Sequence, residues 1–431
     1  MRILVLGSGA REHALSAALT SDPNVTHVVC APGNAGIART IATTPVDLLD
    51  TAAVIRLVGR ERIDLTVVGP EAPLAAGLAD RFTAAGRRVF GPTQAAARLE
   101  TSKAFAKDFM QRHAVPTARY RVCPSASAAL QSIRSGEFGD ALVVKADGLA
   151  AGKGVVVATD RATAEQAVNA AMVDRSFGDA GASVVLEELL TGPEVSFFVV
   201  ADGEEYVPLL SAQDHKRIFD DDRGPNTGGM GAFSPSPLMN DGLQSEIERQ
   251  IVRPVLRGMA AEGNPFRGFL YCGLMLTPEG PKVIEFNVRF GDPEAQVVFP
   301  LLTESLSRLL FDWPKSQVPS PKPQRVAVGV VLAAHGYPGE VRTGDVIHGL
   351  DDVARDCPEV QLRYAGVKQQ GDELVTAGGR VLTVVATALS FEIAIARAYE
   401  AASKIKFDGM QFRRDIGQKA LTEDQKKSSH S

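Results

Sequence analysis

The fold of the N-terminal part is decided near the start of the chain, by Ile3-Leu4-Val5-Leu6-Gly7-Ser8-Gly9-Ala10-Arg11-Glu12-His13. Four apolar residues, a glycine turn and the apolar segment Ala14–Leu19 predict a strand followed directly by a helix. This pattern opens a doubly wound α/β domain with a parallel sheet. The glycines would let backbone N–H groups at the start of the helix approach an anion, and Arg11 adds a positive charge.

Two alternatives remain for this turn. A dinucleotide-binding enzyme is the first, but Glu12 occupies the third glycine position of that fingerprint. A tight turn with a purely structural role is the second. Similar strand-and-turn units follow at 28–36 and at 65–73, the latter carrying Gly69-Pro70-Glu71. Because ligands bind at the carboxyl ends of parallel strands, we expect the three loops to form one pocket in a domain spanning residues 1–101.

Bulk composition restricts the class of protein. A chain of 431 residues predicts about three domains. The 46 Lys and Arg against 51 Asp and Glu give a net charge of −5, which argues against a general nucleic-acid or membrane-surface binder. Four scattered cysteines indicate neither a zinc site nor a disulfide framework. We therefore expect a reduced, cytoplasmic setting, with no signal peptide or membrane helix, and favour a monomer while leaving the oligomeric state open.

A second glycine-rich segment follows in the middle of the chain. Two β-branched strands within Ala141–Val157 flank a loop with three glycines and Lys153, which predicts a hairpin that folds over phosphates. It is not a Walker loop, because Asp147 stands where the first glycine would be. A flexible hairpin with an exposed lysine is the alternative. Lys145 ends an apolar run, where a lysine usually has an anionic partner.

The segment 213–231 shows almost no periodic hydrophobicity and contains Asp214, His215 and Lys216 among several glycines. Long segments without secondary structure inside compact domains tend to be functional loops. This segment therefore predicts binding of a phosphorylated or zwitterionic substrate. Since no nucleophile pattern accompanies His215, we expect it to donate a hydrogen bond and not to act as a base.

The stretch Lys282–Glu294 carries the strongest candidate for a metal site. If Ile284–Val288 is a strand, Ile284, Phe286 and Val288 face one way and Glu285, Asn287 and Arg289 the other. A carboxylate and a carboxamide two residues apart suit Mg²⁺ held beside nucleotide phosphates. The alternative is a solvated edge strand, but a hairpin with Gly268–Leu276 would place Glu285 and Asn287 in the interior of a sheet.

The remaining boundaries follow from composition. We expect a middle domain at 102–320, in which the glycine hairpin would lie on a lid of about 121–190, and a C-terminal α+β domain at 321–417. The proline-rich run Trp313–Pro323 is a linker candidate. The polar tail 418–431 is expected to be disordered.

Taken in order along nearly the whole chain, these motifs resemble the phosphoribosylamine-glycine ligase family of the ATP-grasp superfamily. The resemblance rests on 7–15, 145–154, 213–217, 224–231, 285–287, 289–294 and His335-Gly336-Tyr337-Pro338-Gly339. It implies an α/β and α+β multidomain fold whose central ATP-grasp domain grips ATP between two small sheets. It also implies a ligase of purine biosynthesis that uses ATP, Mg²⁺ or Mn²⁺, glycine and phosphoribosylamine, and forms glycyl phosphate on the way to glycinamide ribonucleotide.

The resemblance also implies roles for individual residues. The nucleotide would contact Lys103, Lys145, Gly152, Lys153, Gly154, Glu187, Glu188, Leu189, Leu190 and Glu194. The metal would be held by Glu285 and Asn287. The catalytic group would be Asp214, Arg289 and Lys145, and the substrates would contact Gly9, Arg11, Gly69, Pro70, Glu71, Asp214, Lys216, Arg289, Gly291, Asp292 and Glu294.

Three other functions are weighed against this one. They are an ATP-grasp ligase for another acid or amine, a nucleotide sensor that has lost turnover, and a NAD enzyme. The presence of both expected metal ligands, Glu285 and Asn287, argues against a sensor, and Glu12 argues against NAD. The chain offers lysines and glycine loops and no Ser-His or Cys-His pair, as expected for phosphoryl transfer without a covalent nucleophile.

Overall fold

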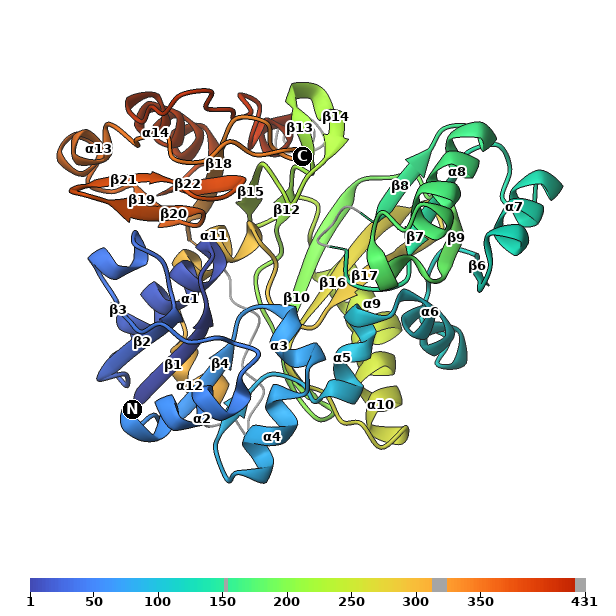
Figure 1. Cartoon of the computed structure of the whole chain (residues 1–431), viewed down its shortest axis with the longest axis horizontal. Coiled ribbons are helices and arrows are strands. Elements are labelled where there is room, and N and C mark those ends of the chain that lie inside the picture. Colours follow the sequence, from blue (N-terminus) through green and yellow to red (C-terminus); the bar gives the residue numbers. More distant parts are fainter. Residues whose placement is uncertain (151–153, 312–323, 423–431) are drawn as a thin grey trace.

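The computed structural model describes residues 1–150, 154–311 and 324–422. These residues form four sheets of four or five strands and two two-stranded ribbons. In Figure 1 the N-terminal unit, in blue, lies below the C-terminal unit, in orange and red, and a lid in teal and green projects to the other side. The chain is therefore a multidomain α/β and α+β protein, as expected.

The N-terminal sheet is parallel throughout, with the order β3-β2-β1-β4-β5. Its strands are β1 (Arg2–Gly7), β2 (His27–Pro32), β3 (Ala42–Thr43), β4 (Leu65–Val68) and β5 (Val89–Phe90). Side chains of β1 alternate between two cores: Ile3 packs with α1 (Ala10–Thr20) and Leu4 with α2 (Thr51–Arg60). The doubly wound prediction is confirmed, and the loops after β1, β2 and β4 share one edge of the sheet.

The lid is an antiparallel sheet of order β6-β9-β7-β8, covered by α7 (Ala126–Ser135) and α8 (Arg161–Val168). Its strands are β6 (Tyr120–Cys123), β7 (Leu142–Ala146), β8 (Val155–Ala158) and β9 (Val184–Glu188). The predicted hairpin is confirmed by the pairing of β7 with β8. Two of its expected phosphate contacts, Gly152 and Lys153, lie outside the described residues.

A different sheet, which faces the lid, has the order β11-β10-β16-β17. Its strands are β10 (Glu194–Asp202), β11 (Glu205–Pro208), β16 (Arg267–Thr277) and β17 (Gly280–Asn287). The predicted β16–β17 hairpin is confirmed, but the expectation that it places Glu285 and Asn287 in a sheet interior is wrong, because β17 is the edge strand. Part of that edge is covered by the chain at 116–117, where Pro116 O accepts from Val283 N at 2.8 Å.

The C-terminal sheet has the order β12-β15-β18-β22-β19. Its strands are β12 (Gln213–Asp214), β15 (Gly231–Ser234), β18 (Val326–Ala333), β19 (Gln361–Tyr364) and β22 (Arg380–Ala388). Two of them come from the segment that was expected to lack secondary structure, which also contains the ribbon of β13 (Arg217–Phe219) and β14 (Arg223–Asn226). The C-terminal unit thus shares its sheet with the substrate segment.

The tail was expected to be disordered from residue 418, but residues 418–422 are helical and Ala420 is fully buried. The rest of the tail and the linker candidate Trp313–Pro323 fall outside the described residues. The remaining elements are α3 (Glu71–Ala75), α4 (Leu78–Ala84), α5 (Gln94–Thr101), α6 (Lys103–Arg112), α9 (Asp241–Ile247), α10 (Arg253–Ala261), α11 (Glu294–Val298), α12 (Leu306–Phe311), β20 (Val367–Gln370), β21 (Glu373–Thr376), α13 (Leu350–Asp356) and α14 (Phe391–Lys404), with short 3-10 or π turns at Ile37–Arg39, Asn169–Val173, Gly178–Gly181, Asp220–Asp222, Glu248–Val252 and Phe299–Leu301.

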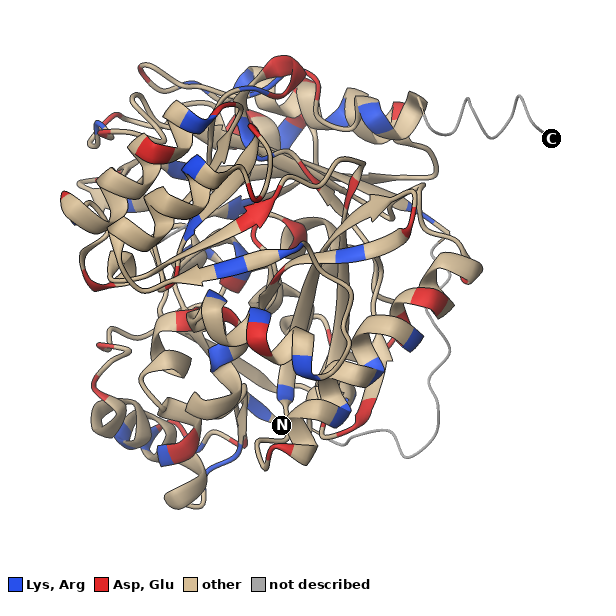
Figure 2. Ribbon diagram, turned by 90° about the vertical axis from the view of Figure 1, so that its right-hand side faces the viewer, with Lys and Arg blue, Asp and Glu red and all other residues tan. Residues whose placement is uncertain are grey.

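Acidic and basic residues are interspersed along the ribbons on the lid side of the molecule (Figure 2). Among the described residues, no helix combines the length and apolar character needed to cross a membrane.

Candidate active site

The strand β17 does not alternate as its sequence predicts. Gly273 of β16 pairs with Glu285 and Leu274 pairs with Val283, so Ile284 is an extra residue in a β-bulge. Val283 and Phe286 are buried, whereas Ile284 is half-buried. The predicted common face of Ile284, Phe286 and Val288 is therefore wrong at Ile284. Its carbonyl oxygen instead accepts a hydrogen bond from Lys145 Nζ at 2.9 Å.

A carboxylate that sequence reasoning missed, Glu100, holds the end of β17. Its Oε2 accepts from Val288 N at 2.7 Å, and its Oε1 lies 2.9 Å from Arg289 Nη2. The Asn287 amide, oriented by its hydrogen-bonding surroundings, donates from Nδ2 to Glu100 Oε1 at 3.1 Å. Burial raises the pKa of Glu100, and Arg289 opposes that shift. Glu100 thus fixes the directions of a predicted metal ligand and of a predicted catalytic arginine.

Arg289 lies between two carboxylates from the N-terminal part of the chain. Besides Glu100, it contacts Glu71 Oε2 through Nε at 3.3 Å. Burial would lower the pKa of Arg289, but Glu100 and Glu71 outweigh it and the pKa is raised. The structure therefore brings two predicted substrate residues, Glu71 and Arg289, into direct contact.

The two predicted phosphate lysines lie on different elements, Lys103 at the start of α6 and Lys145 on β7. Lys103 donates to Gly148 O at 3.2 Å, and Asp147 Oδ1 caps the same helix start by accepting from Ala104 N. Burial lowers the pKa of Lys103, while Glu285 is the largest influence raising it. Lys145 is 5% exposed and lies 2.9 Å from Glu187 Oε1. Both ammonium groups are thus held close to β17.

Glu187 and its neighbours were expected to contact adenine through backbone groups. The Glu187 side chain has a further role that the sequence did not indicate, because its second oxygen lies 2.9 Å from Lys107 Nζ. Glu188 pairs with Arg119 at 2.6 Å. Leu189 and Leu190 follow the end of β9, and their backbone groups make no hydrogen bond within the described part of the chain.

A second cluster lies where β10, β12 and α11 meet. Lys216 Nζ is 2.6 Å from Glu194 Oε2, so two residues expected to contact different substrates are ion-paired here. Burial raises the pKa of Asp214, with Lys216 opposing. Burial and the neighbouring Asp214 raise the pKa of Glu294 to about 7. Glu294 also accepts a hydrogen bond from Ser196 Oγ at 3.0 Å.

The N-terminal loops are organised by Glu12. Its carboxylate accepts from Gly9 N at 2.7 Å and from Arg11 Nε at 2.6 Å. A methyl group at Gly7 or Gly69 would lie 2.3 or 2.2 Å from Glu12 atoms. The side chain therefore fills the space between the loops after β1 and β4. Glu12 stands at the third glycine position of the dinucleotide fingerprint, where that fold packs the helix closely against the strand.

The C-terminal unit contributes Arg380, a contact that the sequence did not indicate. Its guanidinium donates to Gly228 O at 2.6 Å, to Asp292 O at 2.8 Å and to Asp292 Oδ2 at 2.8 Å. Tyr337 OH accepts from Gly228 N at 2.8 Å. Burial would raise the pKa of Asp292, but Arg380 and other cations keep it lowered. One arginine thus holds the glycine segment and the Gly291–Glu294 turn together.

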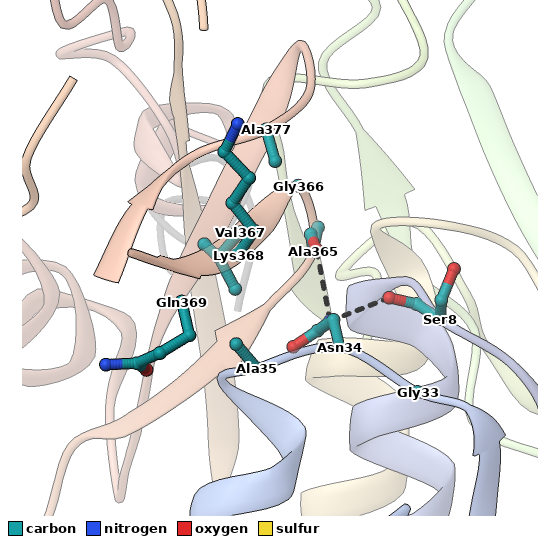
Figure 3. Close-up of a pocket in the computed structure, with 10 residues that line it drawn as sticks. All are labelled: Ser8, Gly33, Asn34, Ala35, Ala365, Gly366, Val367, Lys368, Gln369 and Ala377. Carbon is teal, nitrogen blue, oxygen red and sulfur yellow. Dashed lines mark hydrogen bonds between the residues drawn. The ribbon is translucent and has the colours of Figure 1, made fainter. Parts of the chain in front are cut away.

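A cavity of about 390 Å³ lies between the N- and C-terminal units, beside the loops after β1 and β2. Asn34 spans it by donating to Ser8 O at 2.7 Å and Ala365 O at 3.0 Å (Figure 3). Lys368 and Gln369 line the opposite wall. Ser8, the residue before Gly9, is among the residues that line this cavity.

Glu285 influences the pKa values of several neighbouring groups. Its charge acts on the pKa values of groups from four regions of the chain, namely Lys103, Asp214, Lys216, Tyr271 and Arg289. Among the described residues no group of three or more His, Cys, Asp or Glu has metal-binding geometry. Glu285 and Asn287, the predicted metal ligands, lie two residues apart at the C-terminal end of β17, and the Asn287 nitrogen donates to Glu100.

The chain is similar to a known protein family along most of its length. The chain matches phosphoribosylglycinamide synthetase over three consecutive domains: the N domain at residues 1–100, the ATP-grasp (A) domain at 101–295 and the C domain at 327–419. It is similar to the phosphoribosylamine-glycine ligase of Vibrio parahaemolyticus, with 47% identity over 99% of this chain and 100% of that protein. The enzyme of the same name from Streptomyces coelicolor is 51% identical over 97% and 99% of the two chains.

Solved structures show the same architecture. The crystal structure of phosphoribosylamine-glycine ligase from Thermotoga maritima has a TM-score of 0.84 and 34% identity, covering 96% of this chain and 100% of that one. The biotin carboxylase domain of 2-oxoglutarate carboxylase from Hydrogenobacter thermophilus has a TM-score of 0.71 at 16% identity, covering 95% and 91%, which shows a shared fold only.

Proposed function

The chain belongs to the phosphoribosylglycinamide synthetase family, and we propose below which residues carry out its reaction as an ATP-dependent phosphoribosylamine-glycine ligase. It joins glycine to phosphoribosylamine in purine biosynthesis and uses ATP with a divalent metal. Two observations carry the residue assignment: Lys145 donates to the carbonyl oxygen of Ile284, the residue before Glu285, at 2.9 Å, and the charge of Glu285 acts on the pKa values of Lys103, Lys216 and Arg289. A carboxylate surrounded by cations beside a phosphate-suited hairpin fits a site where phosphoryl charge is neutralised.

ATP is proposed to lie between the lid sheet and the β10–β17 sheet. Lys103 and Lys145 contact its phosphates, and we propose Gly152, Lys153 and Gly154 as further phosphate contacts. The unpaired backbone groups of Leu189 and Leu190 suit the edge of the adenine, and Glu194 suits the ribose hydroxyls. Because Glu194 is ion-paired with Lys216, ribose binding would have to share or displace that lysine.

The metal is proposed to be Mg²⁺ or Mn²⁺, held by Glu285 and the Asn287 amide oxygen. The fit is supported by the donor set, one carboxylate and one amide whose nitrogen already donates to Glu100. When bound, the ion neutralises charge on the transferring phosphoryl group.

Glycine is proposed to bind through its ammonium group at Asp214 and Glu294, with Arg289 and the Gly291–Asp292 turn near its carboxylate. A carboxylate is a poor acyl donor, so its oxygen takes the γ-phosphoryl group of ATP and releases ADP. The amine of phosphoribosylamine then attacks the acyl carbon of glycyl phosphate, the C–O bond to phosphate breaks, and the amine loses a proton. The chain supplies positioning and charge and no covalent nucleophile.

Phosphoribosylamine is proposed to approach along the loops with Gly9, Arg11, Gly69, Pro70 and Glu71. The contact between Glu71 and Arg289 supports this placement, because it joins these loops to the acyl site. We further propose that the enzyme acts in the cytoplasm as a monomer, without nucleic-acid or membrane partners.

The test is ADP release with ATP, glycine and freshly generated phosphoribosylamine, with and without a chelator. Metal-dependent ADP formation that requires both other substrates is expected, and titrating Mg²⁺ against Mn²⁺ identifies the preferred ion. ADP formation with a different acid in place of glycine would reassign the substrate. Equal rates for the wild type and Glu285→Gln would refute the metal role of Glu285.

A further inference from the structure

Lys107 is a buried cation that no step of the proposed reaction uses. It lies on α6, one turn after Lys103, and its side chain is 3% exposed. Burying an ammonium group is costly unless it is paired, so such a residue is expected to have a defined set of partners. The structure supplies two, Glu187 Oε2 at 2.9 Å and Thr117 Oγ1 at 2.7 Å.

Both partners lead to the same point on the edge strand β17. Glu187 also contacts Lys145, whose Nζ donates to Ile284 O at 2.9 Å. Thr117 donates its hydroxyl proton to Val283 O at 2.7 Å. The two branches from Lys107 therefore end on consecutive residues of the bulge that precedes Glu285, and they join the lid strands β7 and β9 to β17 (Figure 1).

The charges of this cluster are unbalanced in a direction that suits a nucleotide. Lys107, Lys145 and Glu187 are each no more than 5% exposed and together carry two positive charges and one negative. Burial would raise the pKa of Glu187, but Lys145 and Lys107 outweigh it and keep the pKa lowered. The remaining net positive charge lies on the side of Lys145, where the nucleotide phosphates are proposed to bind.

We propose that Lys107 is a positioning residue of the nucleotide site, which shares the charge of Glu187 so that Lys145 keeps a net positive charge for ATP, and which fixes the bulge of β17 through Thr117. This inference rests on the proposed function, because it takes Lys145 as the phosphate contact. Lys107 itself does not touch the nucleotide, since Glu187 lies between it and Lys145.

The experiment compares Lys107→Met with two other variants. Lys107→Arg keeps the positive charge. Lys404→Met is the control, because it removes a lysine of α14 that lies 2.9 Å from Asp356. The readouts are kcat and KM for each substrate, and calorimetric binding of a non-hydrolysable β,γ-imido analogue of ATP with Mg²⁺. Lys107→Met is expected to raise KM for ATP and weaken analogue binding by at least about tenfold. KM for glycine should stay within about twofold, Lys107→Arg should recover most of the affinity, and Lys404→Met should match the wild type within about twofold.

The pH profile separates positioning from a purely structural role. Burial lowers the pKa of Lys107 to about 8. Glu187 opposes this shift and Lys145 adds to it. Glu188 and the Tyr120 ring also face the ammonium group. Above that pH Lys107 is neutral, so Lys145 alone compensates the negative charge of Glu187. KM for ATP in the wild type should therefore rise above pH 8, and this rise should be absent in Lys107→Arg.

Two outcomes overturn the proposal: unchanged analogue affinity in a folded Lys107→Met, or a wild-type KM for ATP that stays flat to pH 9. If Lys107→Met does not fold, Thr117→Val decides, since it keeps the Glu187 pair and removes the hydroxyl link to Val283. It should weaken analogue binding by about threefold. Because calorimetry needs no turnover, a wild type that binds the analogue but makes no ADP with glycine and phosphoribosylamine would refute the proposed function and leave this test intact.

Discussion

Lys145 and Ile284 join the two sheets of the candidate nucleotide site through one hydrogen bond of 2.9 Å, from the lysine Nζ to the backbone carbonyl oxygen. The bond exists because a bulge turns the Ile284 carbonyl out of the β16–β17 ladder. The next residue is Glu285. This bond therefore connects the lid strand β7 to the residue that precedes the candidate metal ligand.

Glu285→Gln should lower the rate of metal-dependent ADP formation by roughly a hundredfold or more, because the amide lacks the charge that holds a divalent cation. ADP release at saturating ATP, glycine and phosphoribosylamine measures this. The control is Glu279→Gln in the turn before β17, whose side chain is 71% exposed and pairs with Lys282. Equal losses in both variants would indicate damage to the hairpin and not loss of a metal ligand.

Local pattern was enough to predict much of the fold. The strand and helix around Gly7 and the β7–β8 and β16–β17 hairpins all depend on neighbouring residues, whose periodicity and turn glycines are visible in the sequence. Alternation along β17 failed at Ile284, because a bulge is set by the partner strand and by Lys145, which comes from another sheet.

The sequence did not indicate the roles of Glu100 and Arg380, and the physical reason is the same for both. Glu100 accepts from Val288 across 188 residues of sequence, and Arg380 reaches Asp292 across 88. Buried polar groups must find partners, but which partners meet is decided by tertiary packing. The signal available in the sequence was a charge next to an apolar segment, as at Lys107 and Glu100, and it does not identify the partner.

Arg380→Met should lower kcat/KM for glycine roughly ten- to a hundredfold while the affinity for the ATP analogue stays unchanged, because the arginine holds Gly228 and Asp292 in place and lies away from the lid. Steady-state kinetics and calorimetry measure the two effects. The matched control in the C-terminal unit is Arg397→Met. It removes an arginine of α14 that lies 3.6 Å from Glu359. A loss of analogue affinity equal to the loss for glycine would contradict a local effect.

The acid limb of the pH profile should report Glu294. Burial and Asp214 raise its pKa to about 7, so lowering the pH through 7 adds a proton and removes a negative charge beside the proposed ammonium site. kcat/KM for glycine at saturating ATP should fall as the pH drops from 8 to 6. In Glu294→Gln, kcat/KM for glycine should be lower and should lack this fall between pH 8 and 6.

Ser196→Ala provides a directional check on that assignment. The Ser196 hydroxyl donates to Glu294 at 3.0 Å and lowers its pKa. Removing the donor should therefore move the acid limb to higher pH. A shift to lower pH, or an unchanged limb in Glu294→Gln, would assign the titration to another group.

Gly69→Ala should destabilise the N-terminal loops and weaken phosphoribosylamine binding. The added methyl group would lie 2.2 Å from Glu12 Oε1, and Glu12 cannot easily move because it is 2% exposed and bonded to both Arg11 and Gly9 N. Overpacking of this kind lowers the free energy of unfolding by roughly 1–3 kcal/mol. Thermal unfolding and KM for phosphoribosylamine measure the two effects. Gly59→Ala on α2, where the nearest atom would be Arg87 Nη2 at 3.8 Å, should instead leave stability unchanged or raise it, so equal melting temperatures for the two variants would show that Glu12 does not hold the loops apart.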